Sequence, residues 1–151
     1  MNKKYKIGFT CGSWDIIHWG FIEMFKECKE ICDYLIVGLQ TDPSIDRKEK
    51  NKPIHPLEKR KKVLEAIKYI DEIIIYSTEE DLYNLLKKLL DEKKIDIRII
   101  GADWKGKKYT GDNLPIPIYF NERNHNWSAS ELRKRIYDAE KEKRENNPEI
   151  N

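Results

Sequence analysis

Cysteine and histidine are scarce in this sequence, and long apolar runs are missing. Its 151 residues include 3 cysteines and 3 histidines, without a Cys-x-x-Cys pair, which argues against a structural zinc site. Cys11, Cys28 and Cys32 form no disulfide-like framework and fit free thiols in a reducing compartment. No apolar stretch approaches the roughly 20 residues that cross a bilayer, and residues 1–4 lead into a strand-like run instead of a signal peptide. We therefore expect a cytoplasmic protein without membrane insertion.

An excess of charge of one sign is lacking as well. The chain has 29 basic and 27 acidic residues, so its net charge is +2. This balance offers no global attraction for nucleic acid, so any basic function must be local. With 39% apolar and 37% charged residues, the composition favours one globular domain over residues 1–151, frayed from about residue 145 onward.

Strand-like and helical patterns alternate along the chain. Apolar runs predict strands and apolar residues at helical spacing predict helices, with charged or proline-bearing loops between them. This order predicts an α/β fold, a single doubly wound, Rossmann-like parallel sheet with helices on both faces. The prolines before residue 118 favour a terminal or edge strand. The expected strands cover residues 6–10, 34–40, 72–76, 95–100 and 115–120, and the expected helices cover 21–32, 56–69, 79–93 and 129–143.

Residues 10–21, TCGSWDIIHWGF, follow the first expected strand and are typical of a glycine turn that opens a helix. A helix start presents unpaired N–H groups and the positive end of a dipole, so it suits a phosphate. His18 lies where its side chain would reach the same anion, and Gly20 leaves out a Cβ where a ligand approaches. Taken alone, His18 is also a candidate helix cap or packing residue. Asp15 is a candidate cap, a partner for His18 or a metal ligand.

The spacing of this segment resembles the HxGH superfamily of nucleotidyltransferases, above all the bacterial glycerol-3-phosphate cytidylyltransferases. Their pattern is Gly-Thr-Phe-Asp, two apolar residues and His-Trp-Gly-His, whereas the last position here is Phe21. The resemblance covers about residues 5–136 and implies that His18 donates to a triphosphate as charge develops during transfer. It also implies a nucleotide site along the turn, formed by Phe9, Thr10, Cys11, Gly12, Ser13, Asp15, Gly20 and Phe21.

A basic segment, residues 48–60 (KEKNKPIHPLEKR), precedes and begins the second expected helix. Such charge runs are most often solvated faces. The resembled family carries a mobile lysine-bearing loop here, followed by an arginine. This implies catalytic contacts from Lys52 and Arg60 and an acceptor contact from Lys48. Two anions must be brought together in the implied reaction, and a guanidinium suits bidentate phosphate binding.

A third segment, residues 101–107 (GADWKGK), resembles the family's Gly-Asp-Asp-Trp-x-Gly-Lys element, with Ala102 in place of the first aspartate. The resemblance implies a nucleotide contact from Asp103 and an acceptor contact from Trp104. Packing under the loop is an equally good interpretation of Trp104. Because the segment follows an expected strand, it belongs to the edge of the sheet where ligands of such folds bind.

The fourth segment, residues 123–130 (RNHNWSAS), resembles the family's Arg-Thr-x-Gly-x-Ser-Thr-Thr/Ser element. The resemblance implies a catalytic Arg123 and a nucleotide-binding Ser128, and Ser128 also fits a capping box with Glu131. Phe21 cannot donate to a phosphate. If the family histidine acts as one preorganised donor, its loss costs on the order of 2–4 kcal/mol of transition-state stabilisation. His125, expected beside the acceptor, is a hypothetical replacement donor.

Together the segments imply transfer of CMP from CTP to a small phosphorylated alcohol, with release of pyrophosphate and glycerol 3-phosphate as the favoured acceptor. Mg²⁺ is expected with CTP, held largely by the phosphates and without a metal cage from the protein. The resemblance also implies a homodimer. Because of Phe21, two alternatives stay open: a nucleotide-binding relative with weak or no catalysis, and an adenylyltransferase of the same superfamily.

Overall fold

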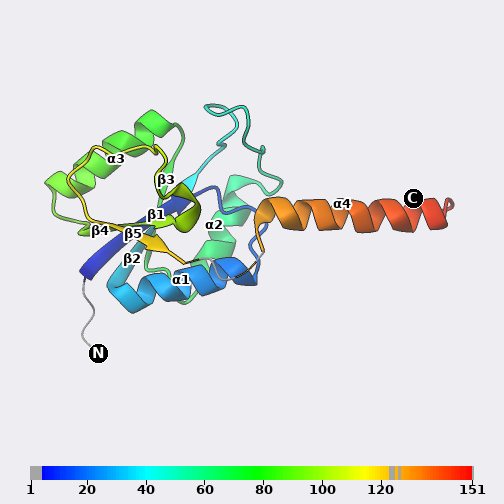
Figure 1. Cartoon of the computed structure of the whole chain (residues 1–151), viewed down its shortest axis with the longest axis horizontal. Helices are drawn as coiled ribbons and strands as arrows, with labels where there is room; N and C mark the ends of the chain where they lie inside the picture. Colours follow the sequence, from blue (N-terminus) through cyan, green and yellow to red (C-terminus); the bar gives the residue numbers. More distant parts are fainter. Residues whose placement is uncertain (1–4, 123–124, 126, 151) are drawn as a thin grey trace.

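Five parallel strands form the central sheet of the computed structural model, which describes residues 5–122, 125 and 127–150. Within these ranges, four α-helices and one 3₁₀ turn accompany the strands (Figure 1). The strands are β1 (Tyr5–Gly12), β2 (Cys32–Gln40), β3 (Glu72–Tyr76), β4 (Ile97–Gly101) and β5 (Ile118–Asn121). The helices are α1 (Trp19–Ile31), α2 (Leu57–Glu65), α3 (Glu79–Asp91) and α4 (Ala129–Asn146), and the 3₁₀ turn is η1 (Ala102–Trp104).

The sheet has the strand order β3-β2-β1-β4-β5, and every neighbouring pair is parallel. The order reverses between β1 and β4, which makes this the topological switch point of the fold. β1 pairs with β4 at Gly8–Ile97 and Phe9–Arg98, whereas its ladder with β2 continues to Gly12–Leu39. The two central strands therefore part beyond Phe9. The predicted α/β, Rossmann-like parallel sheet is confirmed.

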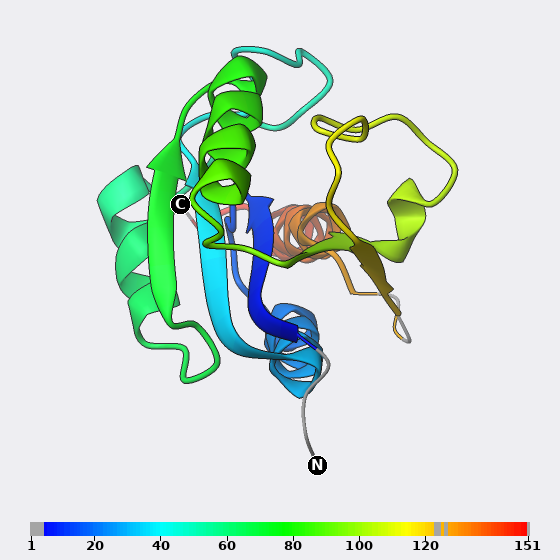
Figure 2. The ribbon, with the colours of Figure 1, turned by 90° about the vertical axis from the view of Figure 1, so that its left-hand side faces the viewer.

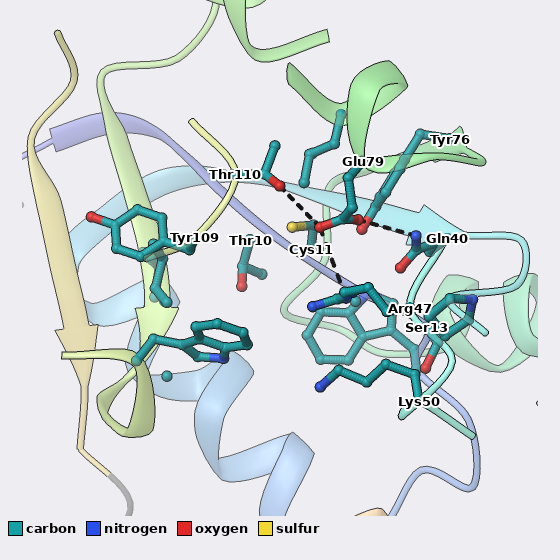
Figure 3. A pocket seen from close by; sticks show the side chains of 18 of the residues that line it. Thr10, Cys11, Ser13, Gln40, Arg47, Lys50, Tyr76, Glu79, Tyr109 and Thr110 are labelled. Atoms are coloured by element: carbon teal, nitrogen blue, oxygen red, sulfur yellow. Dashed lines mark hydrogen bonds and ion pairs between the residues drawn. The ribbon is translucent and has the colours of Figure 1, made fainter. Parts of the chain in front are cut away.

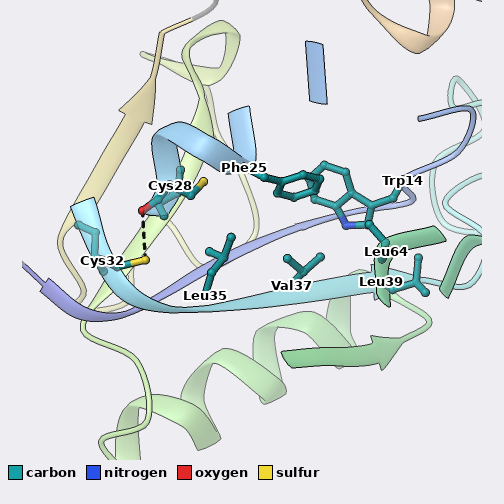
Figure 4. Packing of buried hydrophobic residues seen from close by; sticks show 10 residues of the cluster. Trp14, Phe25, Cys28, Cys32, Leu35, Val37, Leu39 and Leu64 are labelled. Atoms are coloured by element: carbon teal, nitrogen blue, oxygen red, sulfur yellow. Dashed lines mark hydrogen bonds between the residues drawn. The ribbon is translucent and has the colours of Figure 1, made fainter. Parts of the chain in front are cut away.

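Helices cover both faces of this sheet, as predicted. α1 and α2 lie on one face, where Phe25 and Leu64 pack with the strand residues Leu35 and Val37 (Figure 4). α3 lies on the opposite face (Figure 1) and contributes an apolar stripe of helical spacing. The buried residues of that stripe are Leu82, Leu86 and Leu89.

α4 lies outside this layered body. It has no buried residue and extends away from the sheet (Figure 1). Exposed ion pairs one helical turn apart run along it, such as Lys134–Asp138 at 2.9 Å and Arg144–Glu140 at 2.7 Å. Such pairs contribute little to stability, because water competes for both charges. The helix ends at Asn146, and the fraying expected from about residue 145 stays a prediction.

The second helix is shorter than predicted. α2 ends at Glu65 instead of residue 69, and Pro56 is its N-cap instead of a residue of its first turn. The N–H groups of Ala66 and Ile67 donate to the carbonyls three residues earlier, at 3.2 and 3.0 Å. These tighter bonds close the helix before the apolar pattern ends.

The predicted edge position of the last strand is confirmed, although the strand is shorter than expected. Pro115 and Pro117 lack the N–H that a ladder requires, so β5 begins at Ile118. Figure 2 shows β5 and β3 at opposite edges of the sheet. In the ranges that the structure describes, no helix is long and apolar enough to cross a membrane.

Candidate functional site

Two adjoining pockets lie at the carboxyl ends of the strands. The first, of about 840 Å³, opens where β1 and β4 part, and the second, of about 670 Å³, runs along α1 from His18 to Glu30. Volumes of this size are typical of small-molecule sites. The two pockets adjoin, because five residues line both of them: Phe21, Met24, Gly101, Trp104 and Ala129.

The turn between β1 and α1 has an unusual backbone. Trp14 and Ile16 have positive φ angles of 51° and 49°, a left-handed conformation that costs a residue other than glycine about 1–2 kcal/mol. Trp14 holds this conformation because its ring is buried against Phe25, and its Nε1 donates to the Gly38 carbonyl at 2.8 Å. The turn is therefore a preformed wall of the first pocket.

His18 is the N-cap of α1. Its Nδ1 accepts the N–H of Gly20 at 3.0 Å, so the capping interpretation of this histidine is correct. The ring also lines the second pocket, so capping leaves it beside the expected anion site. Phe21 stacks on His18 with ring centroids 4.4 Å apart and meets Trp14 edge to face at 5.6 Å. Phe21 thus packs against the imidazole and offers no donor of its own.

Asp15 ties the basic loop to the β1–α1 turn. The carboxylate is buried and accepts the N–H groups of Ile54 at 2.8 Å and His55 at 3.0 Å. It does not cap α1, because His18 occupies the N-cap. Asp15 also belongs to the wall of the first pocket. Its observed contacts therefore position the loop that carries the predicted phosphate-binding lysines.

Arg60 is 3% exposed, and its guanidinium faces backbone carbonyls. It donates to Ser13 at 2.8 Å, Gln40 at 2.7 Å, Thr41 at 2.6 Å and His55 at 2.9 Å. Burial lowers the pKa of this guanidinium, and nearby carboxylates oppose the shift. In this structure Arg60 joins the turn, the end of β2 and the basic loop, a role that the sequence did not reveal. A phosphate contact from Arg60 stays a prediction.

The cations at the first pocket differ from those expected. Arg47 and Lys50 lie in its wall (Figure 3). The Lys50 ammonium lies 5.6 Å from the centre of the Trp104 ring. Lys48 and Lys52 belong to the same loop but are exposed and are not among the lining residues described. The phosphate-binding role that the charge pattern and the resemblance assign to this loop stays a prediction. Which lysine faces the first pocket depends on the backbone path of the loop, and the pattern of charges along the sequence does not determine that path.

A polar cluster forms the deep part of the first pocket. The Glu79 carboxylate accepts from Gln40 Nε2 at 3.2 Å and from Thr110 Oγ1 at 3.0 Å, and Arg47 lies 3.9 Å away (Figure 3). Arg98 donates to the Thr110 carbonyl. Sequence reasoning missed this cluster. Arg98 could have indicated it, because a charged residue inside an apolar strand needs a polar partner. Thr110 carries no comparable sequence signal.

Cys11 and Tyr76 also line this pocket and are held neutral. Burial raises the pKa of the Cys11 thiol, although the Arg98 guanidinium opposes the shift. Burial likewise raises the pKa of the Tyr76 hydroxyl. A thiol of raised pKa forms little of the thiolate that acts as a nucleophile. The pocket therefore favours binding over covalent catalysis by Cys11.

The second pocket is framed by the N-terminal ends of two helices. α1 contributes His18 and Gly20, and α4 contributes its N-cap, Ser128, whose Oγ accepts the N–H of Glu131 at 3.0 Å. This bond is one half of the predicted capping box, while the Glu131 carboxylate accepts from Arg135 Nε at 3.2 Å. Both helices direct the positive ends of their dipoles toward the site.

The structure places the other expected residues as follows. Thr10, Cys11, Gly12 and Ser13 line the first pocket, and Asp103, Trp104 and His125 line the second. Phe9 is fully buried in the core and packs toward α3, so its side chain points away from both pockets. Arg123 lies outside the described residues. The binding roles assigned to all of these residues stay predictions.

The family model described as cytidylyltransferase-like matches residues 9–135. This range holds the β1–α1 turn, the walls of both pockets and the start of α4. The chain therefore belongs to the cytidylyltransferase-like family. The relationship that the sequence motifs predicted is confirmed at this level.

Particular relatives make the relationship more specific. The glycerol-3-phosphate cytidylyltransferase of Bacillus subtilis (strain 168) is 38% identical over 98 residues, which cover 65% of this chain and 72% of that protein. The bifunctional protein HldE of Campylobacter concisus (strain 13826) is 33% identical over 137 residues, which cover 90% of this chain but 28% of that protein. A crystal structure of the lipopolysaccharide core biosynthesis protein from Thermoplasma volcanium GSS1 has the same fold, with a TM-score of 0.62 at 23% identity over 80% of this chain and 98% of that one.

Proposed function

We propose that this chain transfers CMP from CTP to a small phosphorylated alcohol or sugar and releases pyrophosphate. One observation carries the proposal: two helix N-termini and two imidazoles line one pocket, and this pocket adjoins another whose wall includes Arg47, Lys50 and Glu79. Helix N-termini and neutral imidazole N–H groups are donors that suit phosphate oxygens. The first pocket is large enough to hold an acceptor next to these phosphate-binding groups.

In the proposed reaction the nucleotide phosphates occupy the second pocket and the acceptor occupies the first. Residues 10–13, which the resemblance assigns to the nucleotide, line the first pocket and would therefore border the acceptor. His18 donates to the phosphates from Nε2, and the exposed ring of Trp19 offers a stacking surface for a base. Arg47 and Lys50 attract the acceptor phosphate. An oxygen of that phosphate attacks the α-phosphorus in line, the bond from the α-phosphorus to the bridging oxygen breaks, and pyrophosphate leaves with the electron pair.

The chemistry of the first pocket supports a hydroxylated acceptor. A carboxylate such as Glu79 accepts hydrogen bonds from hydroxyl groups, and Thr110 both donates and accepts. Glycerol 3-phosphate is the favoured acceptor because of the similarity to the Bacillus subtilis enzyme. The pocket volume of about 840 Å³ also admits larger ligands, so sugar phosphates form the second acceptor class in the proposal.

Magnesium enters the proposal as the partner of CTP. In the ranges that the structure describes, no group of three or more His, Cys, Asp or Glu side chains is placed to hold a metal ion. The carboxylate of Asp15, the acidic residue of the turn, already accepts two backbone N–H groups. We therefore propose that the magnesium ion is held largely by phosphate oxygens of CTP. When bound, the ion would neutralise charge on the phosphates.

A second candidate function is nucleotide binding without turnover. Phe21 favours it, because a stacked phenyl ring replaces a donor at a position where the resembled enzymes carry histidine. Loss of one preorganised donor slows catalysis on the order of 100- to 1000-fold. Binding would survive, since the helix N-termini and His18 are retained.

The test is a measurement of pyrophosphate release with Mg²⁺ and either CTP or ATP, against a panel of phosphorylated alcohols and sugars. Release with CTP and one acceptor supports the proposal, and the responsive acceptor identifies the class. Preference for ATP would make the chain an adenylyltransferase. Binding of CTP by calorimetry without release would favour the second candidate. Sedimentation of the same preparation tests the homodimer that the resemblance implies.

A further inference from the structure

We infer that His125 is the second phosphate-binding imidazole of this site and fills the role for which Phe21 has no donor. The inference rests on the proposed nucleotidyl transfer and adds to it a catalytic residue from a distant segment of the chain. Three features carry it: the position of the ring, its tautomer, and the close approach of both rings to Gly20.

The His125 ring lies at the start of α1, beside His18. The two ring centroids are 6.4 Å apart and the ring planes are inclined at 83°. Trp19 packs against His125 with centroids 4.9 Å apart, which holds the imidazole in place. Both histidines line the second pocket, together with the N-cap of α4. A phosphate at the start of α1 would therefore be within reach of both rings.

Hydrogen bonds assign the same tautomer to the two rings. His125 Nδ1 accepts the N–H of Trp127 at 3.0 Å, and His18 Nδ1 accepts the N–H of Gly20 at 3.0 Å. A ring nitrogen that accepts a hydrogen bond carries no proton, so the proton of each neutral imidazole is on Nε2. Each neutral ring therefore carries its proton on Nε2, and a backbone contact at Nδ1 orients each ring before any ligand binds.

Gly20 leaves the space that the two rings occupy at the start of α1. A Cβ at this position would lie 2.5 Å from His125 Cε1, 2.9 Å from His125 Nε2 and 2.7 Å from His18 Cε1. Real Cβ contacts are almost never so short, so any side chain here would displace the rings. Phe21 lies on the other side of His18, stacked at 4.4 Å. His125 thus supplies an imidazole next to the position where the motif lacks one.

His125 acts in this reaction as a hydrogen-bond donor and keeps its proton. The bond from the acceptor oxygen to the α-phosphorus forms while the bond to the bridging oxygen breaks, and the electron pair leaves with pyrophosphate. Negative charge on the phosphate oxygens is stabilised by Nε2–H of His18 and of His125. No proton transfer or additional reactant is needed.

The decisive variants are His125→Ala and His125→Gln, compared with the parent chain and with His55→Ala. His55 is the third histidine of the chain and is exposed, so its replacement controls for the loss of an imidazole. We expect kcat with CTP and the responsive acceptor to fall about 100- to 1000-fold in His125→Ala. Glutamine keeps an N–H donor and should recover part of the rate, whereas His55→Ala should match the parent. Circular dichroism and thermal unfolding check that each variant is folded.

A second background sharpens the test. In Phe21→His, where the missing donor is restored, His125→Ala should cost much less turnover than in the parent. A folded His125→Ala variant with the parent's kcat would overturn the inference, as would an equal loss in both backgrounds. If the parent binds CTP without turnover, CTP affinity is measured instead of kcat. This affinity should fall about tenfold in His125→Ala, a change of about 1.4 kcal/mol. Unchanged affinity would overturn the inference. If the parent binds neither CTP nor ATP, the proposed function itself fails, and the parent alone reveals this.

Discussion

The imidazole rings of His18 and His125 meet above Gly20, with centroids 6.4 Å apart. One ring belongs to the turn after β1, and the other to the segment before α4. The fold therefore assembles a pair of imidazoles that neither segment contains alone. Each Nδ1 accepts a backbone N–H, so the proton of each neutral ring is on Nε2.

Substitution of Gly20 by alanine should reduce nucleotide affinity more than stability. The new Cβ would meet both imidazoles at 2.5–2.7 Å and displace their donor edges, while alanine favours the helix by up to about 1 kcal/mol. We expect CTP affinity to fall about tenfold or more, equivalent to at least about 1.4 kcal/mol. Calorimetric titration with CTP measures this loss. The effect should shrink in a His125→Ala background, and an equal loss there would show that no contact with His125 is involved.

Replacement of Arg60 should mainly destabilise the fold. Arg60→Met removes donors to four backbone carbonyls in a site that is 3% exposed. We expect the free energy of unfolding to fall by about 2–4 kcal/mol, measured by urea denaturation. Lys59→Met is the matched control at the neighbouring exposed position. Lost turnover with unchanged stability would instead favour the phosphate contact that the resemblance implies.

Lys50 should contribute more to acceptor binding than Lys48 does. Lys50 lies in the wall of the first pocket and over the Trp104 ring, whereas Lys48 is exposed outside the described lining. We expect Lys50→Ala to raise the acceptor KM about tenfold, as a loss of about 1.4 kcal/mol in binding would do. Lys48→Ala should raise it less. Steady-state kinetics with varied acceptor decides between them, and the reverse order would mean that the loop rearranges when ligands bind.

The N-terminus of α3 should be sensitive to acid. The Asp81 carboxylate accepts the N–H of Thr78 at 3.0 Å, and hydrogen bonds from Thr78 hold its pKa below the usual range. A pKa lower in the folded state stabilises the protein above the unfolded value, near 3.9, and this stabilisation is lost as the pH falls through the folded value. Asp81→Asn should therefore lower Tm at pH 7 and approach the parent's Tm near pH 2. Glu80→Gln is the exposed control, and a constant gap in Tm across this range would contradict the assignment.

The fold was predictable because its signals are local. Buried parallel strands are continuous apolar runs, as in β2, and an amphipathic helix such as α3 shows its period directly. Element ends were less predictable, since α2 closes with i−3 bonds that depend on the geometry of its last turn. The sequence also did not predict that α4 extends away from the sheet, because a highly charged sequence is compatible with any exposed helix.

The candidate site was predictable where one short segment forms it. The turn with Gly12, Asp15 and His18 carries its own spacing, and the structure brings its residues to the two pockets. The polar cluster around Glu79 joins side chains from four segments, so no local sequence pattern predicts it. The burial of Arg60 could not be predicted for the same reason. Its partners are backbone carbonyls, which every residue carries, so the residue types do not identify them.

The most direct test of the account follows the phosphorus atoms of CTP by ³¹P NMR, in the presence of Mg²⁺, the parent chain and the responsive acceptor. Nucleotidyl transfer predicts that the α-phosphorus signal of CTP moves to that of a diphosphate diester, while pyrophosphate appears in equal amount. The acceptor phosphate signal should disappear at the same rate. Unchanged CTP signals with every acceptor, or release of inorganic phosphate in place of pyrophosphate, would contradict the account.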